Sequence, residues 1–209
     1  LTKQRNIGIS MARGDIVTFL DDDVILESDY FKEIVNAFSS SPNIVAVGGD
    51  ITNSSKLMGF KNFFLTLFLL ERQNNEQGYI QKSGFVNNLE YNTLTNIVET
   101  NTLSGCNYSF RKKIIENHLF DEFFDGYGLS EDVDFTYRVS KVKGNKMVIT
   151  PFAKLIHKES PIARTGFEKL FEMRIVNHYY MFLKHVKSKK SDWIYFWWST
   201  IGVIILAIF

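Results

Sequence analysis

The chain has 209 residues, which is enough for one large domain or two small ones. Apolar residues make up 45% and charged residues 22%, so the composition is that of a globular protein and excludes global disorder. The 24 basic and 23 acidic residues leave a net charge of +1, which argues against a dedicated nucleic-acid binder. The single cysteine excludes a disulfide scaffold and a cysteine-rich zinc module.

The N-terminal part alternates between helical and strand patterns. A short helix is predicted over residues 3–12, and the β-branched apolar run 16–20 is typical of a buried strand. Apolar residues three and four apart predict a helix over 31–38, and a second strand follows at 44–47. Strand, helix and strand in this order favour a right-handed βαβ unit in an α/β sheet.

The middle of the chain is less regular. An apolar stretch over residues 57–70 is too short to span a bilayer, and we expect a buried or interface helix there. Residues 73–100 are polar and rich in asparagine, which indicates a long loop or an irregular hairpin. A helix is predicted to start at Glu131, followed by short strands at 147–149 and 153–157.

The C-terminal part carries a membrane pattern. A helix predicted over residues 167–186 would lie along a membrane surface, and a lysine cluster at 184–190 precedes an uncharged run at 193–209 that begins with aromatic residues. We therefore predict that a transmembrane helix starts at residue 192, with the preceding domain in the cytoplasm. The alternative is a buried C-terminal helix of a soluble domain. We also expect the sequence to be a fragment cut at both ends.

Three consecutive carboxylates, Asp21 to Asp23, follow the first predicted strand. Ligands of open α/β sheets bind beyond the carboxyl ends of strands, and a cation would relieve the repulsion among these carboxylates. Mg²⁺ prefers a few carboxylates together with phosphate oxygens. The alternatives are a solvated acidic turn and a nucleophile loop of the haloacid dehalogenase type. A calcium EF-hand is excluded because Leu26 and Lys32 stand where glycine and glutamate are required.

Three further signals are weaker when taken singly. Glu131 and Asp132 lie at a predicted helix start, where a carboxylate serves either as a general base or as a helix cap. The small residues around Gly105 allow a ligand to approach the backbone closely. His157 ends a predicted strand, either as a metal ligand or as an ordinary surface or core histidine.

Taken together, these motifs form an ordered series. The series consists of Arg5-Asn6-x-Gly8, Ala12-x-Gly14-Asp15, Phe19-Leu20-Asp21-Asp22-Asp23, Gly105-Cys106-Asn107, Phe120-Asp121-Glu122 and Gly128-x-x-Glu131-Asp132-x-Asp134. Over residues 1 to about 157 it resembles the family 2 glycosyltransferases, which are inverting enzymes with nucleotide-sugar donors. The resemblance implies a GT-A fold, an α/β sandwich with a mostly parallel sheet, whose N-terminal nucleotide-binding strands would precede this sequence.

The resemblance also implies roles for individual residues. Asp21 and Asp23 would hold a divalent cation, Mg²⁺ or Mn²⁺, on the donor diphosphate, with His157 as a third ligand. Asp132 would be the catalytic base, with Glu131 beside it. The donor-binding residues implied in this way are Arg5, Asn6, Asp21, Asp22, Gly105 and Asn107.

The expected function is transfer of a sugar from a nucleotide-sugar donor to an acceptor hydroxyl with inversion, in the synthesis of cell-envelope polysaccharide or glycolipid. The acceptor would be a glycan or a lipid-linked molecule. We expect a catalytic domain over residues 1–158, an amphipathic interface region over 159–191 and the start of a transmembrane helix over 192–209. An aspartyl-phosphate phosphotransferase and a non-catalytic membrane-bound binding module stay open as alternatives.

Overall fold

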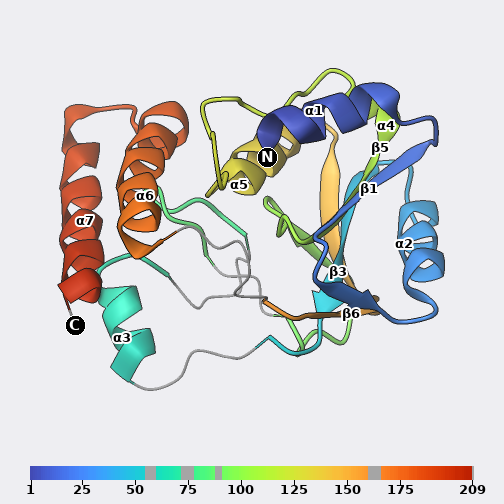
Figure 1. The fold of residues 1–209 in the computed structure, drawn as a ribbon, viewed down its shortest axis with the longest axis horizontal. Coiled ribbons are helices and arrows are strands. Elements are labelled where there is room, and N and C mark those ends of the chain that lie inside the picture. The colour runs from blue at the N-terminus through green and yellow to red at the C-terminus, as the bar shows by residue number, and fades with distance from the viewer. Residues whose placement is uncertain (55–59, 72–77, 88–90, 160–165, 209) are drawn as a thin grey trace. The chain divides into compact units, whose positions relative to one another are not determined.

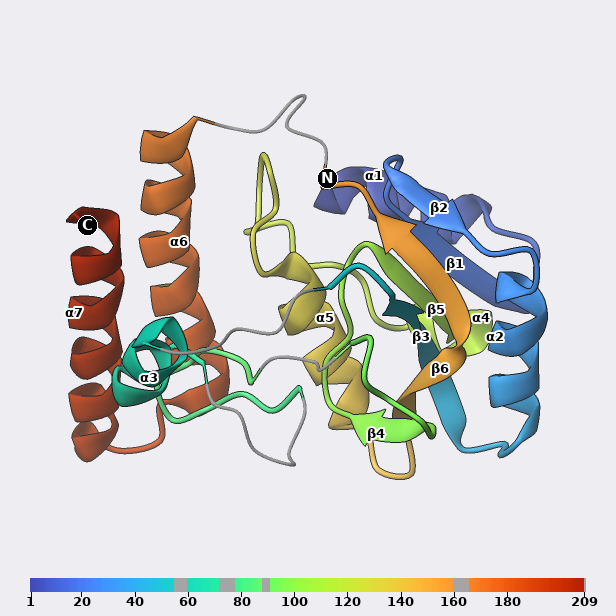
Figure 2. The ribbon, with the colours of Figure 1, turned by 90° about the horizontal axis from the view of Figure 1, so that it is seen from below.

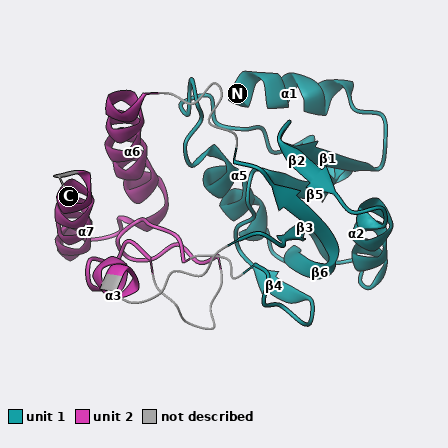
Figure 3. Ribbon diagram, turned by 60° about the horizontal axis from the view of Figure 1, so that its bottom comes forward, with its two compact units in different colours: residues 1–55, 90–163 teal, residues 56–89, 164–209 magenta. Residues whose placement is uncertain are grey.

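The computed structural model describes residues 1–54, 60–71, 78–87, 91–159 and 166–208. The chain forms two compact units (Figure 3). Unit 1 comprises residues 1–55 and 90–163, and unit 2 comprises residues 56–89 and 164–209. Unit 2 thus combines an internal segment with the C-terminal helices. The predicted division into functional domains at residues 158 and 191 stays a prediction.

Unit 1 contains helices and strands that alternate along the N-terminal part of the chain, as predicted (Figure 1). Its helices are α1 (Thr2–Met11), α2 (Tyr30–Ser39), α4 (Lys112–Ile115) and α5 (Glu131–Ser140). Its strands are β1 (Ile16–Leu20), β2 (Val24–Leu26), β3 (Ile44–Ile51), β4 (Val98–Thr100), β5 (Asn107–Arg111) and β6 (Lys146–His157).

The strands form one six-stranded sheet in the order β1-β5-β3-β6-β2, and β4 also pairs with β6. Within the described residues β3 and β6 form the one parallel pair of this sheet, and the other four pairs are antiparallel. The prediction of a mostly parallel sheet is therefore wrong for these residues. The physical reason is that β5 lies between β1 and β3 and runs against both of them.

The predicted strand–helix–strand unit exists as β1, α2 and β3, but its two strands are not neighbours. β1 and β3 run in the same direction because both are antiparallel to β5. A periodicity pattern identifies strands, but it cannot reveal a strand inserted from far along the chain. As a consequence β1 is a half-buried edge strand and not the buried strand that was predicted, whereas every residue of β3 is buried.

Helices cover both faces of the sheet (Figure 2). α2 lies on one face and α5 on the other. The side chains of β5 alternate between these faces: the hydroxyl of Tyr30 on α2 donates to Asn107, and Phe135 on α5 packs edge-to-face on Phe110 at 5.3 Å. Successive residues of this one strand therefore reach opposite layers of the fold.

β6 replaces the two short strands predicted at 147–149 and 153–157. It is continuous from Lys146 to His157, but its register with β3 is irregular between Gly48 and Asp50, opposite the segment that contains Pro151. Proline cannot donate a ladder hydrogen bond, so a bulge there is expected. This irregularity explains why the pattern looked like two strands.

Unit 2 is helical. It contains α3 (Phe60–Leu67), α6 (Phe167–Met181) with a π-helical turn at Phe182–Val186, a 3₁₀ turn at Lys190–Asp192 and α7 (Trp193–Ile208). The helix predicted over 167–186 is thus confirmed, with its last turn widened. The expected helix at 57–70 is confirmed for α3, and residues 57–59 lie outside the described residues. Parts of the predicted loop at 73–100 also lie outside them.

Small and aromatic residues pack α3 against α7. The core of this contact contains Leu65, Phe68, Leu70 and Val203. The ring of Phe68 stacks on Trp198 at 5.0 Å, and a side-chain carbon at Gly202 would collide with Phe68. The described part of the 73–100 segment has a tight turn at 81–84 with an antiparallel bridge between Ile80 and Val86, which agrees with the irregular hairpin given as one of the two predictions, and it also contains β4.

α7 falls within the predicted transmembrane segment 192–209, whose last residue lies outside the described residues. Among the helices that the structure describes, none combines the length and the apolar character needed to cross a membrane. The predicted transmembrane helix is therefore not confirmed.

A buried histidine joins the turn of unit 2 to α6 and α7. His178 contacts the carbonyl of Ser83 at 2.6 Å, so its Nε2 must carry the proton that makes this hydrogen bond. Its ring lies between Phe85, at 4.0 Å, and Phe196, at 4.9 Å. Burial lowers the pKa of His178 from 6.5 to about 4, because the charged imidazolium loses its hydration there.

This environment predicts a pH-dependent stability of unit 2. The unfolded chain takes up the histidine proton below pH 6.5 and the folded chain only near pH 4, so stability falls as the pH drops through this window. The wild type should lose about 3 kcal/mol across it relative to His178→Phe, which keeps the stacking but cannot titrate. Urea denaturation at pH 7.5 and pH 4.5 measures the difference.

The matched control is His118→Gln, at a half-buried histidine of unit 1. This variant should retain the wild-type pH slope. An equal slope in the wild type and in His178→Phe would show that His178 is not the responsible group.

Candidate active site

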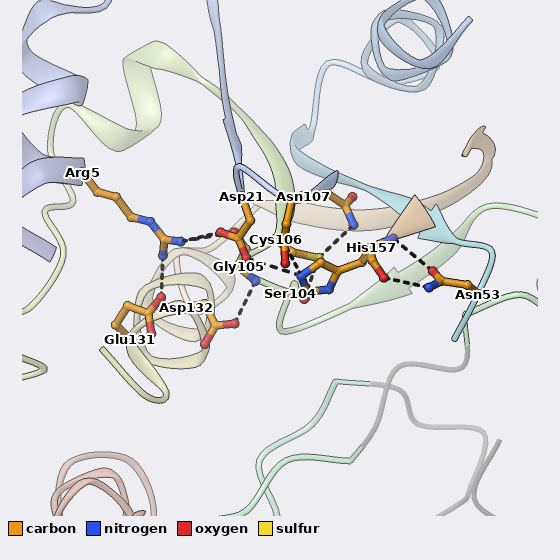
Figure 4. A network of polar contacts seen from close by, with 11 residues as sticks. Arg5, Asp21, Asn53, Ser104, Gly105, Cys106, Asn107, Glu131, Asp132 and His157 are labelled. Carbon is orange, nitrogen blue, oxygen red and sulfur yellow. Dashed lines mark hydrogen bonds and ion pairs between the residues drawn. The ribbon is translucent and has the colours of Figure 1, made fainter. Parts of the chain in front are cut away.

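The Asp21–Asp23 turn leads directly from β1 into β2. Because Val24 of β2 pairs with His157 of β6, the register of this edge brings the turn to the end of β6. His157 Nε2 lies 3.1 Å from Asp23 Oδ1 and 3.9 Å from Asp21 Oδ2. The three residues predicted to share a cation, two from the acidic motif and one from the end of a predicted strand, therefore meet in space. Figure 4 shows Asp21 and His157 of this group.

The donor atoms of these three side chains suit a divalent cation. Two carboxylate oxygens and one imidazole nitrogen lie within 4.8 Å of one another, and all three residues are half-buried. Carboxylates and imidazole are ligands of Mn²⁺, and carboxylates are ligands of Mg²⁺. Burial raises the pKa of Asp21, while Arg5 and His157 act in the opposite direction. The residues fit a metal, and their role as ligands stays a prediction.

Asn53 fixes the backbone of His157, and the sequence analysis did not identify it. Its amide nitrogen donates to the carbonyl of His157 at 2.7 Å, and its amide oxygen accepts the backbone N–H of His157 at 3.0 Å. Asn53 thus replaces a strand partner at the last residue of β6. No local motif marks it, because its role depends on residues 104 positions away.

Asp132 lies in the first turn of α5 and is held by backbone donors. Its Oδ2 accepts the N–H of Gly105 and its Oδ1 accepts the N–H of Val133, each at 2.8 Å. A side-chain carbon at Gly105 would lie 3.2 Å from Asp132, so glycine permits this approach. Burial raises the pKa of Asp132, and the two N–H groups limit the rise.

Glu131 and Arg5 form a buried ion pair beside Asp132. The pair is 2.5 Å long, and the two side chains are 8% and 9% exposed. Burial raises the pKa of Glu131, the charge of Asp132 adds to this rise, and Arg5 opposes it. Arg5 also lies 3.8 Å from Asp21, so one guanidinium connects the acidic turn after β1 with the start of α5 (Figure 4).

Three other residues predicted to bind the donor lie outside the network formed by Arg5 and the acidic side chains. Asn6 exchanges hydrogen bonds with the backbone of Phe120, and so anchors α1 to the loop that follows α4. Asn107 is buried on the α2 side of β5, where its amide oxygen accepts the N–H of Gly49 at 2.5 Å. Asp22 is exposed and makes none of the contacts in the network described above. The roles of these three residues in donor binding stay predictions.

Comparison with known proteins identifies similar sequences and folds. A family model described as Glycosyl transferase family 2 matches residues 1–119. The glucosyl-dolichyl phosphate glucuronosyltransferase of Haloferax volcanii is 33% identical over 51 residues, which cover 24% of this chain and 16% of that protein. The matched segment is therefore a small part of the relative's length.

Two solved structures are similar at low identity. GalNAc-T7 with UDP, GalNAc and Mn²⁺ has a TM-score of 0.53 and 16% identity over 75% of this chain and 30% of its own. The mannosyltransferase PcManGT from Pyrobaculum calidifontis, in complex with GDP-Man and Mn²⁺, has a TM-score of 0.50 and 13% identity over 100% of this chain and 55% of its own. These similarities support a GT-A-like α/β fold.

The burial of the Arg5–Glu131 pair predicts an unequal effect of two charge deletions. Glu131→Gln removes the charged partner of a buried guanidinium and should cost about 3 kcal/mol of unfolding free energy. Glu116→Gln removes one partner of the exposed Lys112–Glu116 pair and should cost about 0.5 kcal/mol or less. Urea denaturation followed by circular dichroism measures both, and equal costs would contradict the role of burial.

Proposed function

Because this chain belongs to glycosyl transferase family 2, we propose that its site moves a sugar from a nucleotide-sugar donor to an acceptor hydroxyl with inversion at the anomeric carbon. The observation that carries the proposal is that two acidic groups with different surroundings occur in one network. Asp21 and Asp23 lie with His157, whereas Asp132 is held by backbone N–H groups. Membership of this family also favours glycosyl transfer over the aspartyl-phosphate phosphotransferase that the sequence left open.

The first group would bind the donor. In our proposal Asp21, Asp23 and His157 hold Mg²⁺ or Mn²⁺ against the donor diphosphate, and Gly105 borders the sugar. A bound divalent cation would stabilise the negative charge of the departing nucleoside diphosphate. Support comes from the donor atoms gathered here and from the two structural neighbours, whose complexes contain Mn²⁺ with UDP or with GDP-Man.

The second group would act on the acceptor. Asp132 would take the proton of the acceptor hydroxyl as the new glycosidic bond forms and the bond to the diphosphate breaks. A base works best when its pKa approaches the working pH, and burial moves the pKa of Asp132 in that direction. The hydroxyl attacks opposite the leaving group in one displacement, so no enzyme nucleophile is needed and the configuration inverts.

We further propose that the protein works at a membrane, with unit 1 in the cytoplasm and a lipid-linked or cell-envelope glycan as acceptor. The support is the arrangement of charged and apolar residues in unit 2. Exposed lysines precede α7, and large apolar residues are exposed along α7 itself. These exposed apolar residues include Ile194, Trp197, Ile201 and Ile204. Cationic and aromatic residues of this kind are typical of a membrane interface.

Two substitutions separate donor binding from transfer. After a thermal-shift panel of nucleotide sugars with Mn²⁺ has identified a donor, Asp23→Asn should lose Mn²⁺-dependent donor binding. Asp132→Asn should bind the donor within about threefold of wild type and lose about 100-fold or more in turnover, because an amide cannot accept the proton. Calorimetry and release of nucleoside diphosphate measure the two effects.

Glu116→Gln serves as the acidic control in both assays and should behave as wild type, because Glu116 belongs to an exposed ion pair with Lys112. Full transfer by Asp132→Asn would refute its role as the base, and donor binding without any transfer in the wild type would favour a binding module.

The membrane proposal is tested by flotation of the full chain with vesicles that contain anionic lipid. The wild type should float with them, and the double variant Ile194→Glu, Trp197→Glu should stay in solution. Phe152→Glu, which adds a charge at an exposed phenylalanine of unit 1, should float as the wild type does. In sealed membranes from expressing cells, added protease should digest unit 1 only when the cytoplasmic face is accessible.

A further inference from the structure

The guanidinium of Arg5 makes its hydrogen bonds inside the fold. Its side chain is 9% exposed; Nη1 donates to Glu131 Oε1 at 2.5 Å and Nη2 donates to the carbonyl of Gly105 at 3.2 Å. The same Nη2 lies 3.8 Å from Asp21 Oδ1. Because its hydrogen bonds are made inside the fold, the guanidinium of Arg5 is poorly placed to bind a phosphate of the donor. Its position therefore differs from the donor contact that the motif implies.

Two aromatic rings fix the plane of this group. The guanidinium carbon lies 5.4 Å from the ring centre of Tyr108 and 5.4 Å from that of Phe120. A planar guanidinium can contact both rings through its faces and donate hydrogen bonds at its edge. A lysine ammonium is a point charge, so it could not keep the contacts to Glu131 and Gly105 in the same geometry.

The contacts of Arg5 link four segments that are far apart in the sequence. Arg5 lies on α1, Asp21 follows β1, Gly105 precedes β5 and Glu131 begins α5 (Figure 4). Gly105 completes the connection, because its carbonyl accepts from Arg5 while its N–H donates to Asp132. A continuous path of contacts thus runs from Asp21 through Arg5 and Gly105 to Asp132.

We infer that Arg5 is a positioning residue, which sets the distance between the carboxylate turn at Asp21 and the base Asp132. The inference rests on the proposed glycosyl transfer, in which the donor lies at the first of these groups and the acceptor hydroxyl at the second. A displacement reaction requires both partners to be aligned, and a misplacement of about 1 Å can cost on the order of 100-fold in rate. A substitution that removes the contacts of Arg5 should therefore lower the turnover number more than it lowers the affinity for the donor.

Unit 1 offers a matched control in Arg111. Like Arg5, this arginine makes two hydrogen bonds inside the fold, here to the backbone carbonyls of Ile44 at 2.8 Å and Phe38 at 2.9 Å, and it lies 5.2 Å from the ring of Phe38. It stands at the opposite end of β5 from the Gly105 loop. Arg111→Lys therefore removes a comparable set of structural contacts without touching Asp21, Glu131 or Gly105.

The experiment compares kcat and donor KM of the full chain for wild type, Arg5→Lys and Arg111→Lys, with Mn²⁺ and the donor from the thermal-shift panel. Arg5→Lys should lower kcat about 30-fold or more while donor KM stays within about threefold. Arg111→Lys should lower the melting temperature and keep kcat within about twofold. If Arg5→Lys does not fold, Arg5→Gln is compared with Arg111→Gln in the same assays.

Each other outcome overturns the inference in a recognisable way. Wild-type kcat in Arg5→Lys shows that Arg5 does not position the site, and a loss confined to donor KM makes it a donor ligand. Equal losses of kcat in Arg5→Lys and Arg111→Lys show a general effect of stability. If the wild type transfers no sugar from any nucleotide sugar, the proposed function fails and the inference fails with it.

Discussion

The charge of one buried guanidinium holds the acidic site of unit 1 together. Glu131 and Asp132 are adjacent at the start of α5, and burial raises the pKa of both because their charged forms lose hydration. The charge of Arg5 opposes the rise of both pKa values, and the same guanidinium also lies 3.8 Å from Asp21. Removing such a charge would leave carboxylates facing one another in a partly dry environment, so the cation and the acids must be kept together.

The second constraint is the register of the sheet edge formed by β2 and β6. Pairing of Val24 with His157 determines that the turn after β1 reaches the imidazole, and Asn53 then holds the backbone of His157 at the end of β6. A shift of one residue in this pairing would turn the side chains to the other face. The candidate cation site therefore depends on strand pairing as much as on the three ligands.

Unit 2 follows a different principle, in which aromatic contacts join segments distant in the chain. Phe196 on α7 lies 4.9 Å from both His178 and Phe182, and Phe68 of the α3 segment stacks on Trp198. Large aromatic side chains bury much area and constrain ring geometry, so few contacts suffice to align these helices. The apolar segment at 57–70 is part of the same unit as the C-terminal helices.

The sequence by itself determined the elements of the N-terminal part, the start of α5 and the family, because periodicity, capping and short motifs are local properties of the chain. The same local signals indicated Asp21, Asp23, Asp132 and His157 as candidates. Only the tertiary structure decided that β5 separates β1 from β3, that Arg5 faces inward and that Asn107 is buried on the far side of its strand. Each of these depends on a pairing between residues many positions apart, and such pairings are selected by burial and register in the folded chain, which no local pattern records.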